Sequence, residues 1–223
     1  MNTARVIGLP QEDTPDPSGH LDVVRTLNGS PLASLNGQLC GLMAVDIVGF
    51  NGTRRDDDIQ IYVHKSLYEM LQVAFDQSDV PWAGCVHEDR GDGVLVVVPP
   101  TIPIARLVAV PSKLSLLLRL HNHVSCDAAH IQLRVAMHIG PVHHDGHGFV
   151  GHDVNFLFRL LSARSLRRML SESDAEVALI TSVYMYYNVI RRRPSLADLA
   201  LFRRLRVRVK ETTTQAWART FRA

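Results

Sequence analysis

Apolar positions recur along the chain with two different periods, and these periods predict interleaved strands and helices. Short apolar or alternating runs predict strands over residues 39–46, 82–88, 93–99, 131–142, 176–181, 205–211 and 214–221. Helical spacing predicts helices over residues 58–77, 104–124, 152–170 and 182–192, the second interrupted or kinked near Pro111. The link DRGDG predicts a hairpin between the second and third strands. We therefore expect an α/β (α+β) fold with a mixed sheet covered by helices.

The polar pattern divides the chain into a leader and one compact domain. Residues 1–37 are rich in Pro, Gly, Asp, Ser and Asn with weak periodicity, which predicts a flexible or loosely packed leader. We expect the compact domain over residues 38–223, without internal repeats. Three consecutive acids, Asp56 to Asp58, favour a helix start there, because carboxylates stabilise the positive end of a helix dipole.

Composition excludes several classes of protein. The chain has 223 residues, 46% hydrophobic and 21% charged, which is typical of one globular domain. Lys and Arg total 24 against 22 for Asp and Glu, so no overall basic field indicates a nucleic-acid partner. The arginine-rich segments at residues 191–193 and 201–210 are more typical of solvated faces.

Cysteine usage and hydropathy indicate the compartment. The three cysteines, Cys40, Cys85 and Cys126, form no C-x-x-C pair, so they predict neither a disulfide framework nor a zinc ribbon. The N-terminus has no apolar signal region, and prolines and Arg106 interrupt the most apolar stretch, residues 93–111. We expect a cytoplasmic protein without a membrane span.

Two carboxylates follow strands that we expect to be neighbours. Asp46 closes the first strand, and Asp92 lies in the GDG turn of the hairpin. Hard oxygen ligands at such an open site suit Mg²⁺ or Mn²⁺, which share their coordination shell with phosphate oxygens. The backbone amides that follow, from Ile47 through Val48 and Gly49 to Phe50, form a candidate phosphate-binding turn. The alternative is that each Asp is an ordinary turn or cap residue.

A second pair of polar residues interrupts an apolar helix. Asn155 and Arg159 are four positions apart, so they project from the same helix face. An amide and a guanidinium together can hold a ribose oxygen and a transferring phosphoryl group. On spacing alone, a solvated Asn and Arg pair on the helix surface is the favoured explanation.

Four motifs occur in a recognisable order. VDIVGF, GDG, LRVAMHIGPV and G-x-x-V-N-x-x-x-R together resemble class III nucleotidyl cyclase catalytic domains, the adenylate and guanylate cyclase superfamily, from about Leu39 to the C-terminus. The resemblance implies a ferredoxin-like sheet and conversion of a nucleoside triphosphate to a 3′,5′-cyclic nucleotide and pyrophosphate. It also implies that Asp46 and Asp92 bind two Mg²⁺ or Mn²⁺ ions, assisted by the Ile47 carbonyl.

The same resemblance assigns the remaining roles. Asn155 would orient the ribose, and Arg159 would stabilise the pentavalent phosphorus. Lys210 is the candidate for a triphosphate-binding lysine, although the local spacing departs from the commonest pattern. In this family a head-to-tail homodimer assembles shared active sites from both chains, with the aspartates from one chain and the Asn and Arg from the other.

The resemblance also implies two base-reading positions, Glu88 and Gly148. Glu88, four residues before Asp92, accepts hydrogen bonds only, so it disfavours adenine and suits guanine, uracil or cytosine. Gly148, seven residues before Asn155, offers no side chain to a purine. The chain also resembles the Pycsar anti-phage cyclases that make cyclic UMP or cyclic CMP. We therefore favour UTP or CTP over GTP.

The sequence also allows a zinc site and a catalytically silent domain to be considered. The histidines at positions 138, 143, 144, 147 and 152 lack the paired spacing of a rigid zinc site, so we do not expect zinc. A catalytically silent cyclase-homology domain for nucleotide sensing or dimerisation is the functional alternative. Retention of both aspartates with Asn155 and Arg159 favours the enzyme.

Overall fold

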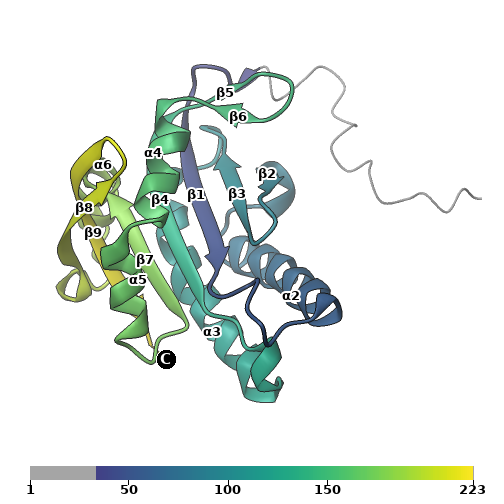
Figure 1. Cartoon of the computed structure of the whole chain (residues 1–223). Helices are drawn as coiled ribbons and strands as arrows, with labels where there is room; N and C mark the ends of the chain where they lie inside the picture. Colours follow the sequence, from purple (N-terminus) through teal and green to yellow (C-terminus); the bar gives the residue numbers. More distant parts are fainter. Residues whose placement is uncertain (1–33, 223) are drawn as a thin grey trace, which may run out of the picture. The chain divides into compact units, whose positions relative to one another are not determined.

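A computed structural model of the chain describes residues 34–222 (Figure 1). Within them, one mixed sheet has the strand order β2-β3-β1-β4-β7-β9-β8. Its strands are β1 (Leu39–Ile47), β2 (Val86–Asp89), β3 (Gly93–Val98), β4 (Leu133–Pro141), β7 (Val177–Ser182), β8 (Arg203–Val209) and β9 (Thr212–Phe221). All neighbours in it are antiparallel except β4 and β7. A separate hairpin joins β5 (His143–His144) to β6 (Phe149–Val150).

Helices cover both faces of the sheet (Figure 1). The α-helices are α2 (Asp57–Asp76), α3 (Val110–Val124), α4 (His152–Leu161), α5 (Arg164–Ser171) and α6 (Val183–Asn188). Short 3₁₀ turns are η1 (Trp82–Gly84), η2 (Ile104–Ala109), η3 (Asp127–Ala129), η4 (Ile190–Arg192) and η5 (Leu199–Leu201). This architecture confirms the predicted α+β fold with a mixed sheet covered by helices. None of the helices in this part of the chain is long and apolar enough to cross a lipid bilayer.

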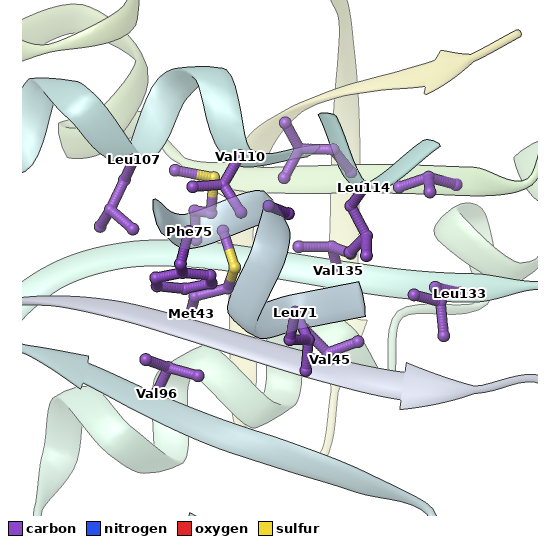
Figure 2. Close-up of a cluster of buried hydrophobic side chains, with 14 of the residues drawn as sticks. Met43, Val45, Leu71, Phe75, Val96, Leu107, Val110, Leu114, Leu133 and Val135 are labelled. Carbon is purple, nitrogen blue, oxygen red and sulfur yellow. The ribbon is translucent and has the colours of Figure 1, made fainter. Parts of the chain in front are cut away.

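The alternation of side chains along β1 creates two cores. Met43 and Val45 point to the face under α2 and α3, whereas Leu42 and Ala44 belong to the cluster under α4 and α5. Figure 2 shows the first core, where Phe75 of α2 lies close to Met43. Burial of apolar area on both faces supplies the main driving force for folding.

Two predicted features at helix starts are confirmed. Asp56 caps α2, and its carboxylate accepts a hydrogen bond from the Ile59 amide at 2.9 Å. Asp57 and Asp58 occupy the first turn, as expected from the helix dipole. Pro111 lies at the start of α3, where a missing N–H is tolerated, so the chain passes from η2 into α3 there instead of kinking one long helix.

Three predicted elements were too long. Residues 82–84 form η1 instead of a strand, because the Cys85 amide donates back to the Trp82 carbonyl at 3.0 Å. The predicted helix over residues 152–170 is two helices, since Ala163 is buried with an extended backbone between α4 and α5. The helix predicted over residues 182–192 is shorter, because α6 ends at Asn188 and the separate turn η4 follows it.

The described chain begins inside the predicted leader. Leu35 is buried in the core under α4 and α5, and Asn36 forms a parallel bridge with Val142. The packed part of the chain therefore starts before Gln38. The rest of the predicted leader, residues 1–33, lies outside the described residues.

Strand register brings the ends of β1, β3 and β4 together. Asp46 lies opposite Gly93 on one side and opposite Arg134 on the other. The Ile47 amide donates to the Asp92 carbonyl at 2.8 Å, which ties the GDG turn to the end of β1. A Cβ atom on Gly93 would lie 2.0 Å from the Val45 carbonyl oxygen, so only glycine permits this approach.

We expect Gly93→Ala to destabilise the fold more than Gly91→Ala. At Gly91, with φ of +80° and open space around it, alanine costs only the left-handed penalty of about 1–2 kcal/mol. At Gly93 the added methyl meets backbone, so the strand pairing beside Asp46 must separate. Urea unfolding of the two variants measures the difference. Equal free energies of unfolding would show that the close approach at Gly93 is unimportant.

Candidate functional site

The candidate site lies at the end of β1, on the face of the sheet that carries α4 and α5. Asp46 and Arg134 sit side by side in register and form an ion pair, with side chains only 14% and 15% exposed. The sequence interpretation missed Arg134. The signal was present, because it is the one charged residue within the apolar β4 segment LRVAMHIGP.

Arg134 neutralises only part of the negative charge at Asp46. The pKa of its carboxyl is raised to about 6, mainly by burial and also by the negative charge of Asp92, and Arg134 and Arg167 only partly oppose this rise. Its Oδ1 atom is buried and has no hydrogen-bond partner among the described residues. The structure thus brings Asp46 and Asp92 together in a place where additional positive charge would stabilise both.

A divalent cation fits this arrangement. No group of three or more His, Cys, Asp or Glu side chains with the geometry of a metal centre occurs in residues 34–222. An ion here would depend on Asp46, Asp92, backbone oxygen and oxygens from a ligand. Mg²⁺ and Mn²⁺ are the ions that accept such incomplete protein coordination, since they retain waters or bind phosphate oxygens.

A basic pocket adjoins the carboxylates. It has a volume of about 420 Å³ and is lined by Val48, Gln132, Arg134, Arg167, Arg168, Leu170 and Ser171. Arg167 of α5 is exposed and, in the part of the chain that the structure describes, has no ion pair. Arg168 is paired with Glu172 at 2.7 Å. Arg134 and Arg167 together therefore offer a place for an anion beside Asp46.

The backbone turn after β1 provides fewer free amides than predicted. The Ile47 amide bonds to Asp92, and the Val48 amide donates to the Gln132 carbonyl at 2.9 Å. These two amides are therefore unavailable for phosphate, which corrects the expectation of a turn running from Ile47 to Phe50. Gly49, with φ of +65°, and Phe50 are the remaining candidates.

The two positions assigned to the base do meet. One oxygen of the Glu88 carboxylate pairs with Arg90 at 2.9 Å, and the other accepts the Phe149 amide at 3.1 Å. A Cβ atom on Gly148 would lie 2.7 Å from Glu88 Oε1, so a side chain at position 148 would displace this carboxylate. Arg90, which the sequence interpretation missed, also stacks over Phe158 of α4 at 5.0 Å.

Helix α4 presents Asn155 and Arg159. Asn155 is exposed, whereas Arg159 reaches the turn between β8 and β9, donates to Thr212 at 2.8 Å and pairs with Glu211. Lys210 lies in the same turn with φ of +50° and an exposed side chain. Arg159 and Lys210 therefore flank Glu211. Among the described residues, no hydrogen bond or ion pair links this group to Asp46 or Asp92.

A buried polar chain fixes the start of α4. His138 contacts Ser182 Oγ at 2.8 Å through Nδ1 and Asp153 Oδ1 at 2.9 Å through Nε2. Burial lowers the pKa of His138, although Asp153 opposes this effect. A Cβ atom on Gly140 would lie 2.4 Å from the Asp153 side chain, so the glycine permits the approach. Asp153 thereby locates the helix that carries Asn155 and Arg159.

Comparison with solved structures finds proteins of the same fold. An adenylate/guanylate cyclase/hydrolase from Silicibacter pomeroyi is 18% identical, with a TM-score of 0.60 over 83% of this chain and 98% of that one. The non-canonical dimeric guanylyl cyclase domain of the RhoGC fusion protein from Blastocladiella emersonii is 19% identical, with a TM-score of 0.54 over 81% of this chain and 95% of that one.

A third solved structure is the guanylate cyclase domain of RhGC from Catenaria anguillulae in complex with GTP. It is 17% identical, with a TM-score of 0.51 over 84% of this chain and 98% of that one. No protein-family model matches the chain, and no curated protein matches its sequence. At these identities, the comparisons establish a shared fold.

We expect Mn²⁺ to stabilise the chain through Asp46 and Asp92. An ion held by the folded state alone, at 100 times its dissociation constant, adds about 2.7 kcal/mol to the free energy of unfolding. Thermal unfolding with and without Mn²⁺ measures this increment, which Asp46→Asn and Asp92→Asn should abolish.

Asp89→Asn is the matched control for the metal experiment. Its carboxylate lies near Asp92 in sequence but is held by Tyr68 at 2.9 Å, by His64 at 2.8 Å and by the Gly91 amide at 2.7 Å. The Asp89 variant should keep the Mn²⁺ increment. An increment that survives in Asp46→Asn and Asp92→Asn would refute the metal assignment.

Proposed function

We propose that this chain, which has the fold of adenylate and guanylate cyclase catalytic domains, converts a nucleoside triphosphate to its 3′,5′-cyclic monophosphate and pyrophosphate. The observation that carries the proposal is the under-neutralised pair Asp46 and Asp92 beside an arginine pocket. A site that gathers two carboxylates and two arginines, Arg134 paired with Asp46 and Arg167 without an ion pair in the described chain, suits a magnesium triphosphate better than an uncharged ligand.

The chemistry needs positioning and charge neutralisation. The ribose 3′ oxygen attacks the α-phosphorus and loses its proton, and the bond between the α-phosphorus and the bridging oxygen breaks to release pyrophosphate. Bound divalent ions would activate the attacking oxygen and neutralise the leaving group. Asp46 and Asp92 would hold those ions, with the Ile47 carbonyl assisting. No covalent nucleophile is required of the protein.

The arginine pocket suits the triphosphate. Arg134 forms an ion pair with Asp46 in the structure. A cation bound at Asp46 would release this guanidinium to bind phosphate oxygens. Arg167 has no ion pair within the described chain and is close enough to influence the pKa of Asp46. Lys210 is the third candidate for binding phosphate, from the turn between β8 and β9.

The second half of the site would come from a twin subunit. Asn155 would orient the ribose and Arg159 would stabilise the pentavalent phosphorus. Neither contacts Asp46 or Asp92 within the described chain, which is the arrangement a head-to-tail homodimer requires. The non-canonical dimeric guanylyl cyclase domain from Blastocladiella emersonii is a neighbour in fold, which supports dimer formation here, and the head-to-tail arrangement is part of the proposal.

The base-reading groups favour a base with an N–H beside a carbonyl. Glu88 supplies a hydrogen-bond acceptor, and Arg90, paired with it, supplies donors. Uracil and guanine match this pattern, cytosine matches it less well, and adenine does not. Since Gly148 contributes no side chain to read a purine, we favour a pyrimidine, UTP first and then CTP, over GTP. Cyclic UMP or CMP in turn favours an anti-phage signalling role in the cytoplasm.

One observation favours the alternative of a silent nucleotide-sensing or dimerisation module. The Arg159 guanidinium is already held by Glu211 and Thr212. This contact must break before Arg159 can reach a phosphoryl group. Because Glu211 is 66% exposed, the ion pair contributes little, and a triphosphate competes with it readily.

Incubation with each of the four nucleoside triphosphates and Mn²⁺ tests the activity. We expect a cyclic product, formed fastest from UTP and not from ATP. Asp46→Ala and Asp92→Ala should abolish it, and Arg159→Ala should lower the rate by ~100-fold to ~1000-fold, as loss of one transition-state donor does. Asp89→Asn should stay active. Nucleotide binding without any product would instead establish the silent module.

Mixing two inactive variants tests the shared site. Asp46→Ala and Arg159→Ala damage different halves, so a mixed dimer regains one intact site of its two. With random pairing, activity should recover to roughly a quarter of the wild-type value, because half of the dimers are mixed. Asp46→Ala mixed with Asp92→Ala is the control and should stay inactive. Failure to recover in the first mixture would place the whole site in one chain.

A further inference from the structure

We propose that a second pocket, on the α2 and α3 side of the sheet, binds an organic carboxylate with an apolar body through Arg219. The pocket has a volume of about 600 Å³ and lies between α3, strands β4, β7 and β9, and the segment from residue 190 to residue 202. Its walls are mainly apolar, and Arg219 is its one lysine or arginine among the described residues.

This pocket is separate from the candidate active site. Met137 of β4 and Leu179 of β7 line it, and both belong to the core under α2 and α3. Arg134, three residues before Met137 on the same strand, points to the opposite face and lines the basic pocket beside Asp46. An occupant of the second pocket therefore does not contact the groups assigned to catalysis.

Two aromatic rings hold Arg219 in place, but one of its hydrogen-bond donors is unpaired. Its guanidinium stacks over Phe221 at 4.1 Å and lies over Phe202 at 5.6 Å. Its Nε atom is buried without a hydrogen-bond partner, and the side chain forms no ion pair in the described chain. A buried donor left unpaired costs about 1–3 kcal/mol. The aromatic contacts thus hold the guanidinium in place, and its N–H groups can still donate hydrogen bonds to a ligand.

Asp198 does not serve as the ion-pair partner of Arg219. Asp198 lines the same pocket, and its charge raises the pKa of Arg219 while burial, the larger effect, lowers it. The Asp198 carboxylate caps η5 by accepting the Ala200 amide at 3.0 Å. Ser112 likewise donates its hydroxyl to the Ala109 carbonyl at 2.8 Å. These two polar side chains of the wall are therefore engaged in local structure, whereas Arg219 is not.

The lining selects the chemical class of the ligand. A planar guanidinium binds a carboxylate through two parallel hydrogen bonds, and a partly desolvated one does so strongly. The apolar walls, formed by residues such as Leu179, Ile190 and Leu196, would exclude a highly hydrated anion and bury a hydrocarbon chain. A medium-chain carboxylate combines both features.

Titration with sodium octanoate tests the site directly. Trp217 reports on it, because its ring stacks on Tyr186 at 4.0 Å, and Tyr186 contacts Phe202 of the pocket wall at 5.4 Å. In a Trp82→Phe background, Trp217 is the remaining tryptophan. We expect a saturable change in its fluorescence and a higher unfolding temperature. Octanol should bind at least about tenfold more weakly, because it cannot pair with the guanidinium.

Two variants separate the site from general apolar binding. Arg219→Met should weaken octanoate binding at least about tenfold. Ala200→Trp, an exposed position on the rim, should block the pocket without touching the core and so decides the matter even if Arg219→Met fails to fold. Arg206→Met removes an exposed arginine from β8 as the matched control and should bind normally.

Undiminished octanoate binding in Ala200→Trp, equal binding of octanol, or the absence of saturable binding to the wild type would overturn the proposal. These measurements follow binding alone. Their outcome is therefore independent of whether the chain turns over a nucleotide.

Discussion

The register of β1 between β3 and β4 is the constraint on which the candidate site depends. It places Asp46 opposite Gly93 and Arg134, and it brings the Asp92 turn within a backbone hydrogen bond of Ile47. A shift by one residue would turn Asp46 into the opposite core, among the side chains of α2 and α3. The close backbone approach at Gly93 prevents such a shift, since no larger residue fits there.

This register also explains why the site is electrostatically unfavourable in the isolated chain. The two carboxylates lie close together, one of them largely buried, and Arg134 neutralises only part of their charge. A protein selected for stability alone would place an apolar or neutral residue at position 46. Such a penalty is typical of sites that gain a charged ligand, because the ligand supplies the compensation that the fold omits.

Helix α4 connects the other functional groups. Its first turn is fixed by the chain from Asp153 through His138 to Ser182, and its last turns touch Arg90 through Phe158 and the β8–β9 turn through Arg159. Arg90, paired with the proposed base-reading residue Glu88, therefore contacts the same helix that carries the proposed transition-state donors Asn155 and Arg159. The pocket at Arg219 lies on the other face of the sheet, where the same strands present their alternate residues.

The sequence by itself determined most elements of the fold and the neighbouring positions of Asp46 and Asp92, because these follow from periodicity and turn residues. It assigned Glu88 and Gly148 to the base only through the family resemblance and did not predict their contact with each other. It did not determine where the predicted helix over residues 152–170 breaks, since only packing on the sheet extends the backbone at Ala163. Nor did it identify Arg134, Arg90 or Arg219. From the sequence alone, a charged residue within a strand is interpreted as solvent-exposed. Only the tertiary structure shows which face of the sheet it occupies and which of its polar atoms have no hydrogen-bond partner.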